Sequence, residues 1–361
     1  MPKNSLWFSN KLISWYLENK RSLPWRETND PYVIWLSEII LQQTRVAQGL
    51  PYFEKFILQY PNVFDLANAS EEQILKLWQG LGYYSRARNL HATAKYVAFE
   101  RNGNFPETFE GLLKLKGIGD YTASAIASIC FKLPTAVVDG NVYRVLSRVF
   151  GIATPINSTK GIVAFKALAQ NLIDATHPGN FNQALMEFGA RYCVPSNPDC
   201  DNCIFNATCI AYQQKRVAQL PVKQNKTKIK TEFYNYLVCL TKDGKTLFEQ
   251  RTQKGIWQNL YQFPLLQSKK ELQLNDLKKN QDFIERTKNM TLQSISKFNE
   301  TMIVHKLSHK NLLTTFWILE VDTFLVEGMP FSEIHKLPVP VLIENFISKF
   351  PPFKNEIFTY I

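Results

Sequence analysis

The segment LKGIGDYTA, at residues 115–123, fixes how the surrounding chain is built, because it places two glycines between two helical patterns. Glycine adopts backbone conformations that other residues avoid, so Gly117 and Gly119 allow a tight turn from one helix into the next. Such a turn presents backbone N–H groups and a helix N-terminus, and both favour an anion such as a phosphate. Contacts of this kind hold a nucleic-acid backbone without reading its bases. Taken alone, the segment also fits an ordinary connection between two helices.

A second motif, VVDGNVYRV at residues 137–145, follows about 20 residues later. Its carboxylate, Asp139, lies between an apolar valine pair and a glycine that frees the backbone, so it can stand at the wall of a cavity. A carboxylate there would stabilise a nearby cation, such as the oxocarbenium-like sugar of glycoside cleavage. An Asp before Gly is by itself more often a helix cap or a turn residue. The residues alone leave both interpretations open, and the family resemblance described below favours the catalytic one.

Four of the six cysteines fall within 17 residues of the chain. They are Cys193, Cys200, Cys203 and Cys209. Such clustering in a cysteine-poor chain indicates metal ligation rather than disulfides. Four thiolates without a histidine suit either Zn²⁺ or a 4Fe-4S cube, and the presence of only one short Cys-x2-Cys pair favours the cube. The other two cysteines, Cys130 and Cys239, lie among apolar residues and are expected in the core.

Together these segments resemble the helix-hairpin-helix DNA glycosylases of the endonuclease III and MutY family. The resemblance is close over about residues 5–215 and weaker over 232–361. It implies base excision repair, and a 4Fe-4S cluster that fixes a loop near Arg191 without breaking bonds. The implied fold class is multidomain, with an all-α helix-hairpin-helix glycosylase domain that carries the cluster loop and a C-terminal α+β Nudix-like domain.

The spacing of apolar residues divides the chain into two parts. Helical spacing continues from Pro31 to about Ala211. It is clearest over residues 33–46, 70–79, 121–131 and 161–175. A basic, polar stretch then indicates a linker. We therefore expect a glycosylase domain at 1–214, a linker at 215–231 and a second domain at 232–361.

After the linker the periodicity of the sequence changes, and the second domain begins with segments that predict strands. The pattern predicts a strand over 233–241, a tight turn at 242–245 and a returning strand over 246–250. A further strand is expected over 313–321.

Glu38 is embedded in the apolar segment VIWLSEIILQQT, residues 33–44. Desolvation would raise the pKa of a carboxyl group held there and make it a proton donor near neutral pH. The alternative is a glutamate on the solvent face of a helix. The segment resembles the MutY-type adenine glycosylases, in which a glutamate at this position protonates the purine so that it can leave. Endonuclease III relatives generally lack a carboxylate here, so the resemblance implies adenine as the leaving base.

The same resemblance implies roles for further residues of a base-flipping site. The extruded adenine would be held by Arg21, Trp25, Arg26 and Leu41. The DNA would be contacted by Gln42, Gln43, Tyr83, Lys116, Gly117 and Gly119. In this arrangement Tyr83 is wedged beside the opposing base, while Asn141 and Tyr121 orient and polarise the reacting groups.

Tyr121 stands where bifunctional relatives carry the lysine that forms a Schiff base with the sugar. We therefore expect hydrolysis by water without strong strand nicking. Two alternatives remain at this point. One is a bifunctional endonuclease III-type glycosylase and lyase for pyrimidine lesions, and the other is a non-catalytic DNA-binding protein that senses redox state through its cluster.

The second domain also resembles a known type. Residues 255–264, GIWQNLYQFP, resemble a turn in the Nudix-like domain of MutY proteins, which recognises 8-oxoguanine opposite adenine. No carboxylate-rich Mg²⁺-binding helix follows, so pyrophosphohydrolase activity is not expected. The family reads the lesion with a Phe-Ser-His loop, and this chain has Leu307, Ser308 and His309. The aliphatic Leu307 departs from that pattern and puts the strength of lesion discrimination in doubt.

Charge and hydropathy bound the partners. The chain has 42 basic and 31 acidic residues, a formal net charge of +11, which favours a polyanion such as DNA. No stretch approaches the apolar length needed to span a bilayer, and none resembles a signal peptide. We expect an intracellular monomer that acts on duplex DNA containing 8-oxoguanine:adenine or guanine:adenine mispairs.

Overall fold

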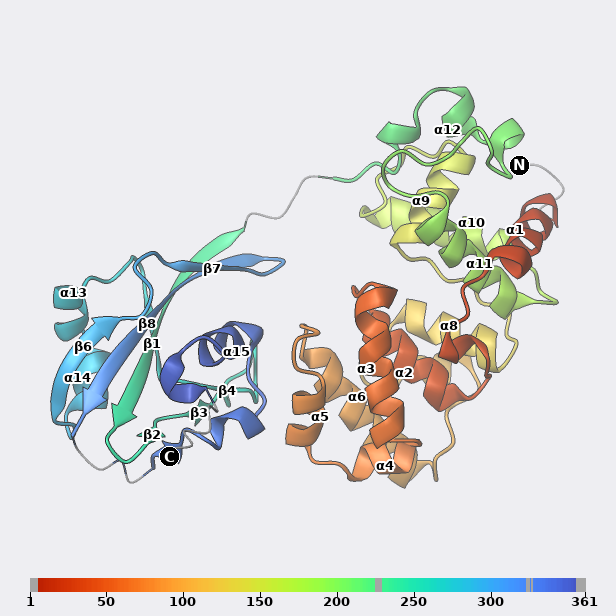
Figure 1. Cartoon of the computed structure of the whole chain (residues 1–361). Coiled ribbons are helices and arrows are strands. Elements are labelled where there is room, and N and C mark those ends of the chain that lie inside the picture. Colours follow the sequence, from red (N-terminus) through yellow and green to blue (C-terminus); the bar gives the residue numbers. More distant parts are fainter. Residues whose placement is uncertain (1–5, 225–228, 323–324, 326, 355–361) are drawn as a thin grey trace, which may run out of the picture. The chain divides into compact units, whose positions relative to one another are not determined.

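The computed structural model describes residues 6–224, 229–322, 325 and 327–354. Its contacts divide the chain into two compact units. The first unit combines residues 1–68 with 89–225, and the second combines 69–88 with 226–361 (Figure 1). Each unit is described by itself below.

The first unit is helical, as the sequence predicts. Its α-helices are α1 (Leu6–Asn19), α2 (Pro31–Leu41), α3 (Val46–Gln59), α4 (Val63–Asn68), most of α6 (Ser85–Lys95), α7 (Phe109–Leu113), α8 (Asp120–Cys130), α9 (Gly140–Val149), α10 (Thr159–Leu172), α11 (Pro178–Arg191) and α12 (Ile210–Gln213). Single turns at Pro24–Arg26, Tyr96–Glu100, Asn206–Thr208 and Val217–Gln219 complete it. No helix in the described part of the chain is both long and apolar enough to cross a membrane.

Helix α2 occupies the centre of this unit because nearly all of its side chains are apolar. It begins at Pro31, where the side chain of Asp30 accepts a hydrogen bond from the backbone N–H of Tyr32 at 2.8 Å. It ends at Leu41, because Gln42 is no longer helical and Gln43 has a left-handed φ of 55°. The helix predicted over 33–46 is therefore wrong at its C-terminal end. The turn that replaces it lies beside the site described below.

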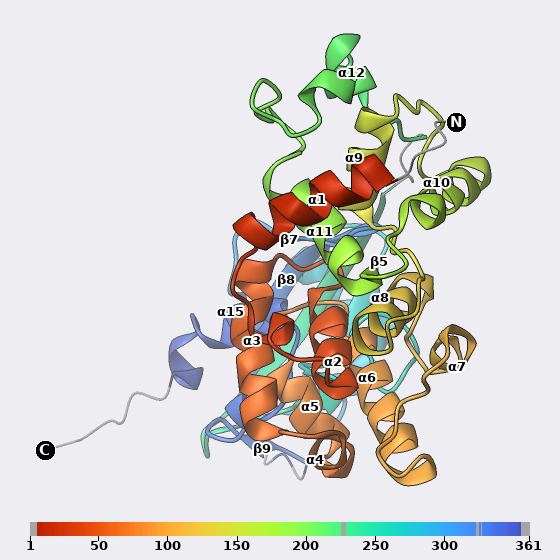
Figure 2. The same ribbon diagram turned by 90° about the vertical axis from the view of Figure 1, so that its right-hand side faces the viewer.

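Helix α11 packs on both α8 and α9, and α8 packs on α2. Gly119 precedes α8 and Asp139 precedes α9, so the two sequence motifs supply the first turns of neighbouring helices. Helix α1 lies alongside α11 (Figure 2). The fold thus gathers segments from both ends of the first unit around the start of α8 and α9.

The second unit contains a sheet with the strand order β5-β1-β8-β6, and β7 also pairs with β8. These strands are β1 (Lys230–Thr241), β5 (Leu265–Ser268), β6 (Leu292–Lys297), β7 (Ile303–Lys306) and β8 (Lys310–Val321). Strands β1 and β8 are parallel over their whole length, with Tyr236 opposite Phe316, and the other pairs are antiparallel. The expected strands over 233–241 and 313–321 are confirmed within β1 and β8.

Both faces of the sheet are covered, because successive side chains of a strand point to opposite sides. On one face Leu237 and Leu319 belong to an apolar cluster with Leu277 and Phe283, from α13 (Leu274–Lys278) and α14 (Gln281–Thr287). On the other face the ring of Phe316 stacks at 4.1 Å on Phe346, from α15 (Val341–Ile347). Single turns at Ile334–Lys336 and Pro351–Phe353 flank α15. The α+β class expected for the C-terminal part is confirmed.

The returning strand predicted over 246–250 is wrong. That stretch forms two short strands, β2 (Lys245–Thr246) and β3 (Glu249–Gln250), and neither pairs with β1. Strand β2 pairs with β9 (Met329–Pro330), and β3 pairs with β4 (Tyr261–Gln262). Between the two, Phe248 packs edge-on against Phe263 at 4.9 Å. The ring is partly buried, and the strands on either side of it pair with β9 and β4 rather than with β1.

A segment from the helical half of the sequence, residues 69–88, belongs to the second unit. It contains α5 (Glu71–Leu77), which begins with a capping box between Ser70 and Gln73. The ammonium of Lys76 donates to the backbone oxygens of His335 at 2.7 Å and Leu337 at 3.1 Å. These contacts tie α5 to the turn that precedes α15.

Candidate active site

Glu38 lies on the buried face of α2 and lines a cavity of the first unit. Only 9% of the residue is exposed. Burial raises the pKa of its carboxyl group to about 7, since the hydrogen bond from Tyr121 and the charge of Arg26 lower it less than burial raises it. The charge of Asp139 raises the pKa further. Glu38 is therefore a carboxyl group that holds a proton near neutral pH.

Asp139 caps α9 and lines the same cavity. Its Oδ1 accepts hydrogen bonds from the backbone N–H groups of Asn141 and Val142, both at 2.8 Å. Its Oδ2 accepts from the side-chain amide of Asn141, also at 2.8 Å. Burial raises its pKa, and these hydrogen bonds counteract that rise. The helix cap and a carboxylate at a cavity wall were alternatives in the sequence, and the structure shows that one residue is both.

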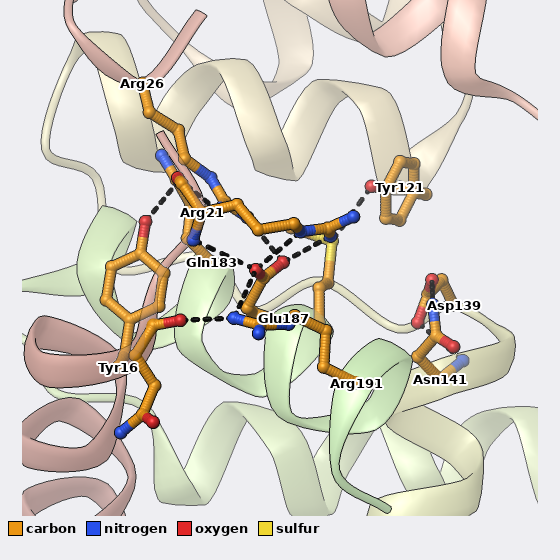
Figure 3. Close-up of polar contacts among 11 residues, drawn as sticks. Tyr16, Arg21, Arg26, Tyr121, Asp139, Asn141, Gln183, Glu187 and Arg191 are labelled. Carbon is orange, nitrogen blue, oxygen red and sulfur yellow. Dashed lines mark hydrogen bonds and ion pairs between the residues drawn. The ribbon is translucent and has the colours of Figure 1, made fainter. Parts of the chain in front are cut away.

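Tyr121 lies in the first turn of α8 and lines the same cavity as these two carboxyl groups. Its hydroxyl donates to the sulfur of Met186 at 2.9 Å (Figure 3). Burial and the charges of Glu38 and Asp139 raise its pKa well above the usual value. Tyr121 is therefore a neutral hydrogen-bond donor at this position.

A cluster of charges closes the opposite side of the cavity. At its centre is Glu187 of α11, with a side chain that is 1% exposed. Arg21 donates to both of its carboxylate oxygens, at 2.7 and 2.5 Å, and Arg26 donates to Oε2 at 2.8 Å (Figure 3). Burial alone would raise the pKa of Glu187, but the two guanidinium groups outweigh it and lower the pKa to about 2.

The cavity brings together all the residues that sequence reasoning proposed for the catalytic site and the adenine pocket. All eight line it: Arg21, Trp25, Arg26, Glu38, Leu41, Tyr121, Asp139 and Asn141. A wider groove shares Glu38, Tyr121 and Asp139 with this cavity. Gln42, Gln43 and Gly119 line the groove, whereas Lys116 and Gly117 lie exposed in the turn before α8 and line neither.

Among the cavity residues that sequence reasoning missed, three on α11 take part in its polar contacts or in the contact with Tyr121. They are Gln183, Met186 and Glu187. The hydroxyl of Tyr16 donates to Gln183 at 2.7 Å, which links α1 to the same cluster. A glutamate within an otherwise apolar helical pattern was the available signal. It was insufficient because its arginine partners are more than 160 positions away in the chain.

The two glycines of the turn before α8 differ in what they require. Gly117 has a left-handed φ of +81°, and a Cβ there would lie 2.7 Å from the Cβ of Asn89. Gly119 has an extended backbone, with φ −96° and ψ −179°, and a Cβ there would meet no atom within 4 Å. The fold therefore explains the glycine at 117 but not the glycine at 119.

Arg144, on α9, connects the catalytic region to the cysteine segment. Its Nη2 donates to the side-chain oxygen of Asn141 at 2.8 Å, and its Nε donates to the backbone oxygen of Cys193 at 2.7 Å. Because Asn141 in turn donates to Asp139, one guanidinium supports the amide that holds the carboxylate. Arg144 lies within the motif at residues 137–145, but its role was not recognised from the sequence.

The four clustered cysteines line one pocket away from the cavity. The guanidinium of Arg148 lies 3.5 Å from the sulfur of Cys193, and the backbone N–H of Phe205 donates to the sulfur of Cys203 at 3.4 Å. Within the described ranges, no three Cys, His, Asp or Glu side chains are grouped closely enough to hold a single metal ion. Of the remaining cysteines, Cys239 is buried as expected and Cys130 is partly exposed.

The remaining predicted site residues lie on the second unit. Tyr83 has a left-handed φ of 47° and is 46% exposed. Leu307, Ser308 and His309 form the turn between β7 and β8, where the N–H of Leu307 donates to the backbone oxygen of Lys310 at 2.8 Å. Ser308 Oγ lies 3.2 Å from Nδ1 of His309, and both side chains are exposed. The turn can therefore present a hydroxyl and an imidazole to a partner.

Two family descriptions match the chain. The first, "HhH-GPD superfamily base excision DNA repair protein", matches residues 36–168, and the second, "NUDIX domain", matches residues 235–349.

Similar curated proteins are adenine DNA glycosylases. The protein of Buchnera aphidicola subsp. Baizongia pistaciae is 36% identical over 317 residues, which cover 87% of this chain and 87% of that protein. The protein of Mus musculus is 46% identical over 222 residues, which cover 59% of this chain and 43% of that protein.

Two solved structures are also similar. A thermostable thymine-DNA glycosylase matches with a TM-score of 0.54 and 30% identity, covering 59% of this chain and 98% of that chain. Endonuclease III trapped on DNA as a covalent intermediate matches with a TM-score of 0.52 and 18% identity, covering 60% of this chain and 99% of that chain. At 18% identity the second likeness shows a shared fold alone.

Proposed function

The chain belongs to the adenine DNA glycosylase family, and on that premise we propose how its residues release adenine that is mispaired with 8-oxoguanine or guanine in duplex DNA. It is a DNA N-glycosylase of base excision repair, which hydrolyses the bond between adenine and deoxyribose. One observation carries the assignment of residues. Two carboxyl groups, Glu38 and Asp139, line one cavity in environments that prepare them for different tasks.

Glu38 is the general acid. Its pKa of about 7 keeps a large share of the group protonated at neutral pH, so it can give a proton to a ring nitrogen of adenine. Protonation makes adenine a better leaving group, and the electron pair of the broken bond stays with the base. Tyr121, neutral at this pH, donates a hydrogen bond in the same cavity and orients the reacting groups.

Asp139 faces the positive charge that develops on the sugar. Its three hydrogen bonds to Asn141 and Val142 favour the charged carboxylate and fix its direction. The carboxylate stabilises the oxocarbenium-like sugar, or bonds to it briefly, until water adds to the sugar carbon. The proton that the water loses passes to a carboxylate of the site, which completes hydrolysis.

In this proposal the charge cluster supplies the polar side of an adenine pocket. Arg21 and Arg26 are held in place by Glu187, so their guanidinium groups stay oriented while the pocket is empty. Trp25, only 6% exposed, and Leu41 offer apolar wall for the flat base. A preorganised pocket of this kind favours a base that has left the helix stack.

The test compares Glu38→Gln and Asp139→Asn with wild-type protein on a duplex that contains one 8-oxoguanine:adenine pair. Each variant should lose most of its adenine release, measured by alkaline cleavage on a gel, and should still bind the duplex. Adenine release at wild-type rates by both variants would exclude these roles.

Hydrolysis without lyase chemistry is supported by the composition of the cavity and the groove. Among the described residues that line them there are arginines but no lysine, and Tyr121 occupies the position of the Schiff-base lysine in bifunctional relatives. Borohydride should therefore trap no covalent adduct between protein and duplex. An adduct formed on a thymine glycol duplex would favour the bifunctional endonuclease III-type alternative.

The four clustered cysteines fit a 4Fe-4S cluster better than zinc. They line a common pocket, and only Cys200 and Cys203 form the short Cys-x2-Cys pair of which structural zinc sites usually have two. Four thiolates without a histidine suit the cube. The role of the group is structural, since it would hold residues 193–209 in place. Cys203→Ser should lower the iron content and the absorbance near roughly 400 nm, whereas Cys130→Ser should leave both unchanged.

The proposed DNA contacts come from three places: the turn before α8, the groove and Tyr83. Lys116, Gly117 and Gly119 offer a charge and backbone N–H groups to a phosphate, and the open space at Gly119 supports close approach of a ligand there. Gln42 and Gln43 contact the strand from the groove, and Tyr83 is the wedge beside the opposing base.

Lesion recognition belongs to the exposed turn of Leu307, Ser308 and His309. Its hydroxyl and imidazole can bond to the polar edge of 8-oxoguanine. With the domain boundaries at 214 and 232 expected from sequence, this turn lies in the Nudix-like domain. The protein would act as a monomer inside the cell, on the chromosome.

A further inference from the structure

The guanidinium of Arg86 is buried under the turn that presents Tyr83. Arg86 is the second residue of α6, and only 8% of it is exposed. Burial lowers its pKa to about 10, which leaves the group charged at neutral pH. A buried charge is costly unless it gains close partners, so its partners indicate what the residue is for.

Those partners belong to the turn and to its base. Nη2 of Arg86 donates to the backbone oxygens of Leu81 at 3.3 Å and Gly82 at 3.2 Å. The guanidinium carbon lies 5.0 Å from the ring centre of Trp78, which is fully buried, and 5.8 Å from that of Tyr83. The guanidinium therefore connects a fixed indole to an exposed phenol ring.

The turn itself is one that needs support. Gly82 has a φ of +76°, and Tyr83 has a φ of +47°, a region that residues with large side chains rarely adopt. Such a conformation persists only where the surroundings impose it. The indole N–H of Trp78 donates to the oxygen of Gly82 at 3.1 Å, so this oxygen accepts from both Trp78 and Arg86. Hydrogen bonds thus hold Gly82, and the guanidinium contact holds the ring of Tyr83, the two residues with left-handed φ.

We propose that Arg86 is a positioning residue for the extrusion of adenine, which holds the ring of Tyr83 ready to enter the stack beside the opposing base. The inference rests on the proposed function, in which Tyr83 is the wedge. A planar guanidinium can lie on the rings and donate along its edge at the same time. Lysine keeps the charge but provides neither the flat face nor the fork.

The test uses the full-length protein and a duplex with an 8-oxoguanine:adenine pair that carries 2-aminopurine next to the adenine. The fluorescence of 2-aminopurine rises when it loses stacking with the neighbouring base. Arg86→Lys should reduce this rise on binding and slow single-turnover adenine release about tenfold, the size expected for losing a cation–π contact and hydrogen bonds to a charged group. Arg88→Lys is the matched control. Arg88 lies on the same helix, and its Nη1 donates to the backbone oxygen of Gln258 at 2.9 Å rather than to the turn.

A double variant separates positioning from general damage. Tyr83→Ala should itself suppress the fluorescence rise, and adding Arg86→Lys to it should cause no further loss. The proposal is overturned if Arg86→Lys behaves as wild type, or if it slows Tyr83→Ala as much as it slows wild type. Should Arg86→Lys not fold, Arg86→Gln, which keeps a planar donor, is measured with the same expectation. Absence of adenine release by wild type would refute the proposed function, while the fluorescence signal would still report on Arg86.

Discussion

At the residue scale, two glutamates of one cavity show how the surroundings set the charge of a carboxyl group. Glu38 and Glu187 are both buried, and burial alone raises the pKa of each. Among the described residues no guanidinium donates a hydrogen bond to Glu38, and its pKa stays raised at about 7. Glu187 receives hydrogen bonds from Arg21 and Arg26, and its pKa falls to about 2. One glutamate can therefore donate a proton and the other can only hold cations.

The raised pKa of Glu38 predicts how catalysis depends on pH. The general acid works only when protonated, so the rate of adenine release should fall as the pH rises through about 7. Single-turnover rates between pH 5 and 9 measure this. A rate that keeps increasing up to pH 9 would contradict the assignment.

The same shift also affects stability. A glutamate whose pKa is raised by folding stabilises the fold below its unfolded pKa, and this contribution is lost as the pH rises through the folded value. Glu38→Gln, which carries no charge, should therefore become more stable than wild type above pH 7, by up to roughly 3 kcal/mol. Thermal melting at pH 4.5 and pH 8 provides the comparison. An unchanged difference between the two proteins at both pH values would rule out a raised pKa.

Glu187 predicts the opposite dependence. Its pKa is depressed by folding, so its stabilisation is present above the unfolded pKa and is lost as the pH falls toward about 2. Glu187→Gln should cost roughly 2 kcal/mol at pH 7, a value reduced because Arg21 is one-third exposed. Urea denaturation of both proteins should show this difference shrinking between pH 5 and pH 2. A difference that stays constant would mean that the charge pairs contribute nothing.

Single residues could be predicted from sequence where the signal was local. The motifs around Glu38 and Asp139 selected both carboxyl groups through their resemblance to the family, and the apolar neighbours of Glu38 gave local support. Glu187 was not found, because its role depends on arginines that only the fold brings near it. The doubled role of Asp139, as cap and as cavity wall, likewise needed the packing of α9.

At the element scale, the turn before α8 predicts a difference between its glycines. Gly117→Ala should destabilise the protein by about 1–2 kcal/mol or more, because its φ is left-handed and its Cβ would contact Asn89. Gly119→Ala should leave stability within about 1 kcal/mol, because its backbone is extended and the space is open. If a phosphate approaches at 119, however, this second variant should bind DNA more weakly. Melting and duplex titration of both variants separate the two requirements.

Helices and strands were predictable where one periodicity continues without interruption. The strands over 233–241 and 313–321 are rich in aromatic and β-branched residues and lie within β1 and β8. The helix expected over 33–46 fails at Gln43, where the backbone turns left-handed before the apolar spacing resumes at Val46. The strand expected over 246–250 fails because its two halves pair with β9 and β4, while Phe248 packs against Phe263. Both errors arise where tertiary contacts act against a local pattern.

At the scale of the whole molecule, the division into units follows contacts rather than chain order. The basic stretch after 214 suggested one boundary, and the contacts place residues 69–88 with 226–361. Sequence could not reveal this, since α5 has the same helical pattern as its neighbours. The bond from Gln79 illustrates the grouping, because its side-chain oxygen accepts from the backbone N–H of Val339 at 3.0 Å.

The backbone passes from one unit to the other three times, at 68–69, 88–89 and 225–226. We therefore expect that cutting it at one of these points does not separate the two units. A protease site introduced between Gln224 and Ile229 would yield two fragments, 1–224 and a C-terminal piece, that remain associated through α5. They should co-elute on gel filtration after cleavage and separate only in denaturant. Elution of two independent species would show that α5 does not hold them. Co-elution would show that residues 69–88, which belong to the first fragment in sequence, keep it bound to the second fragment without an intact linker.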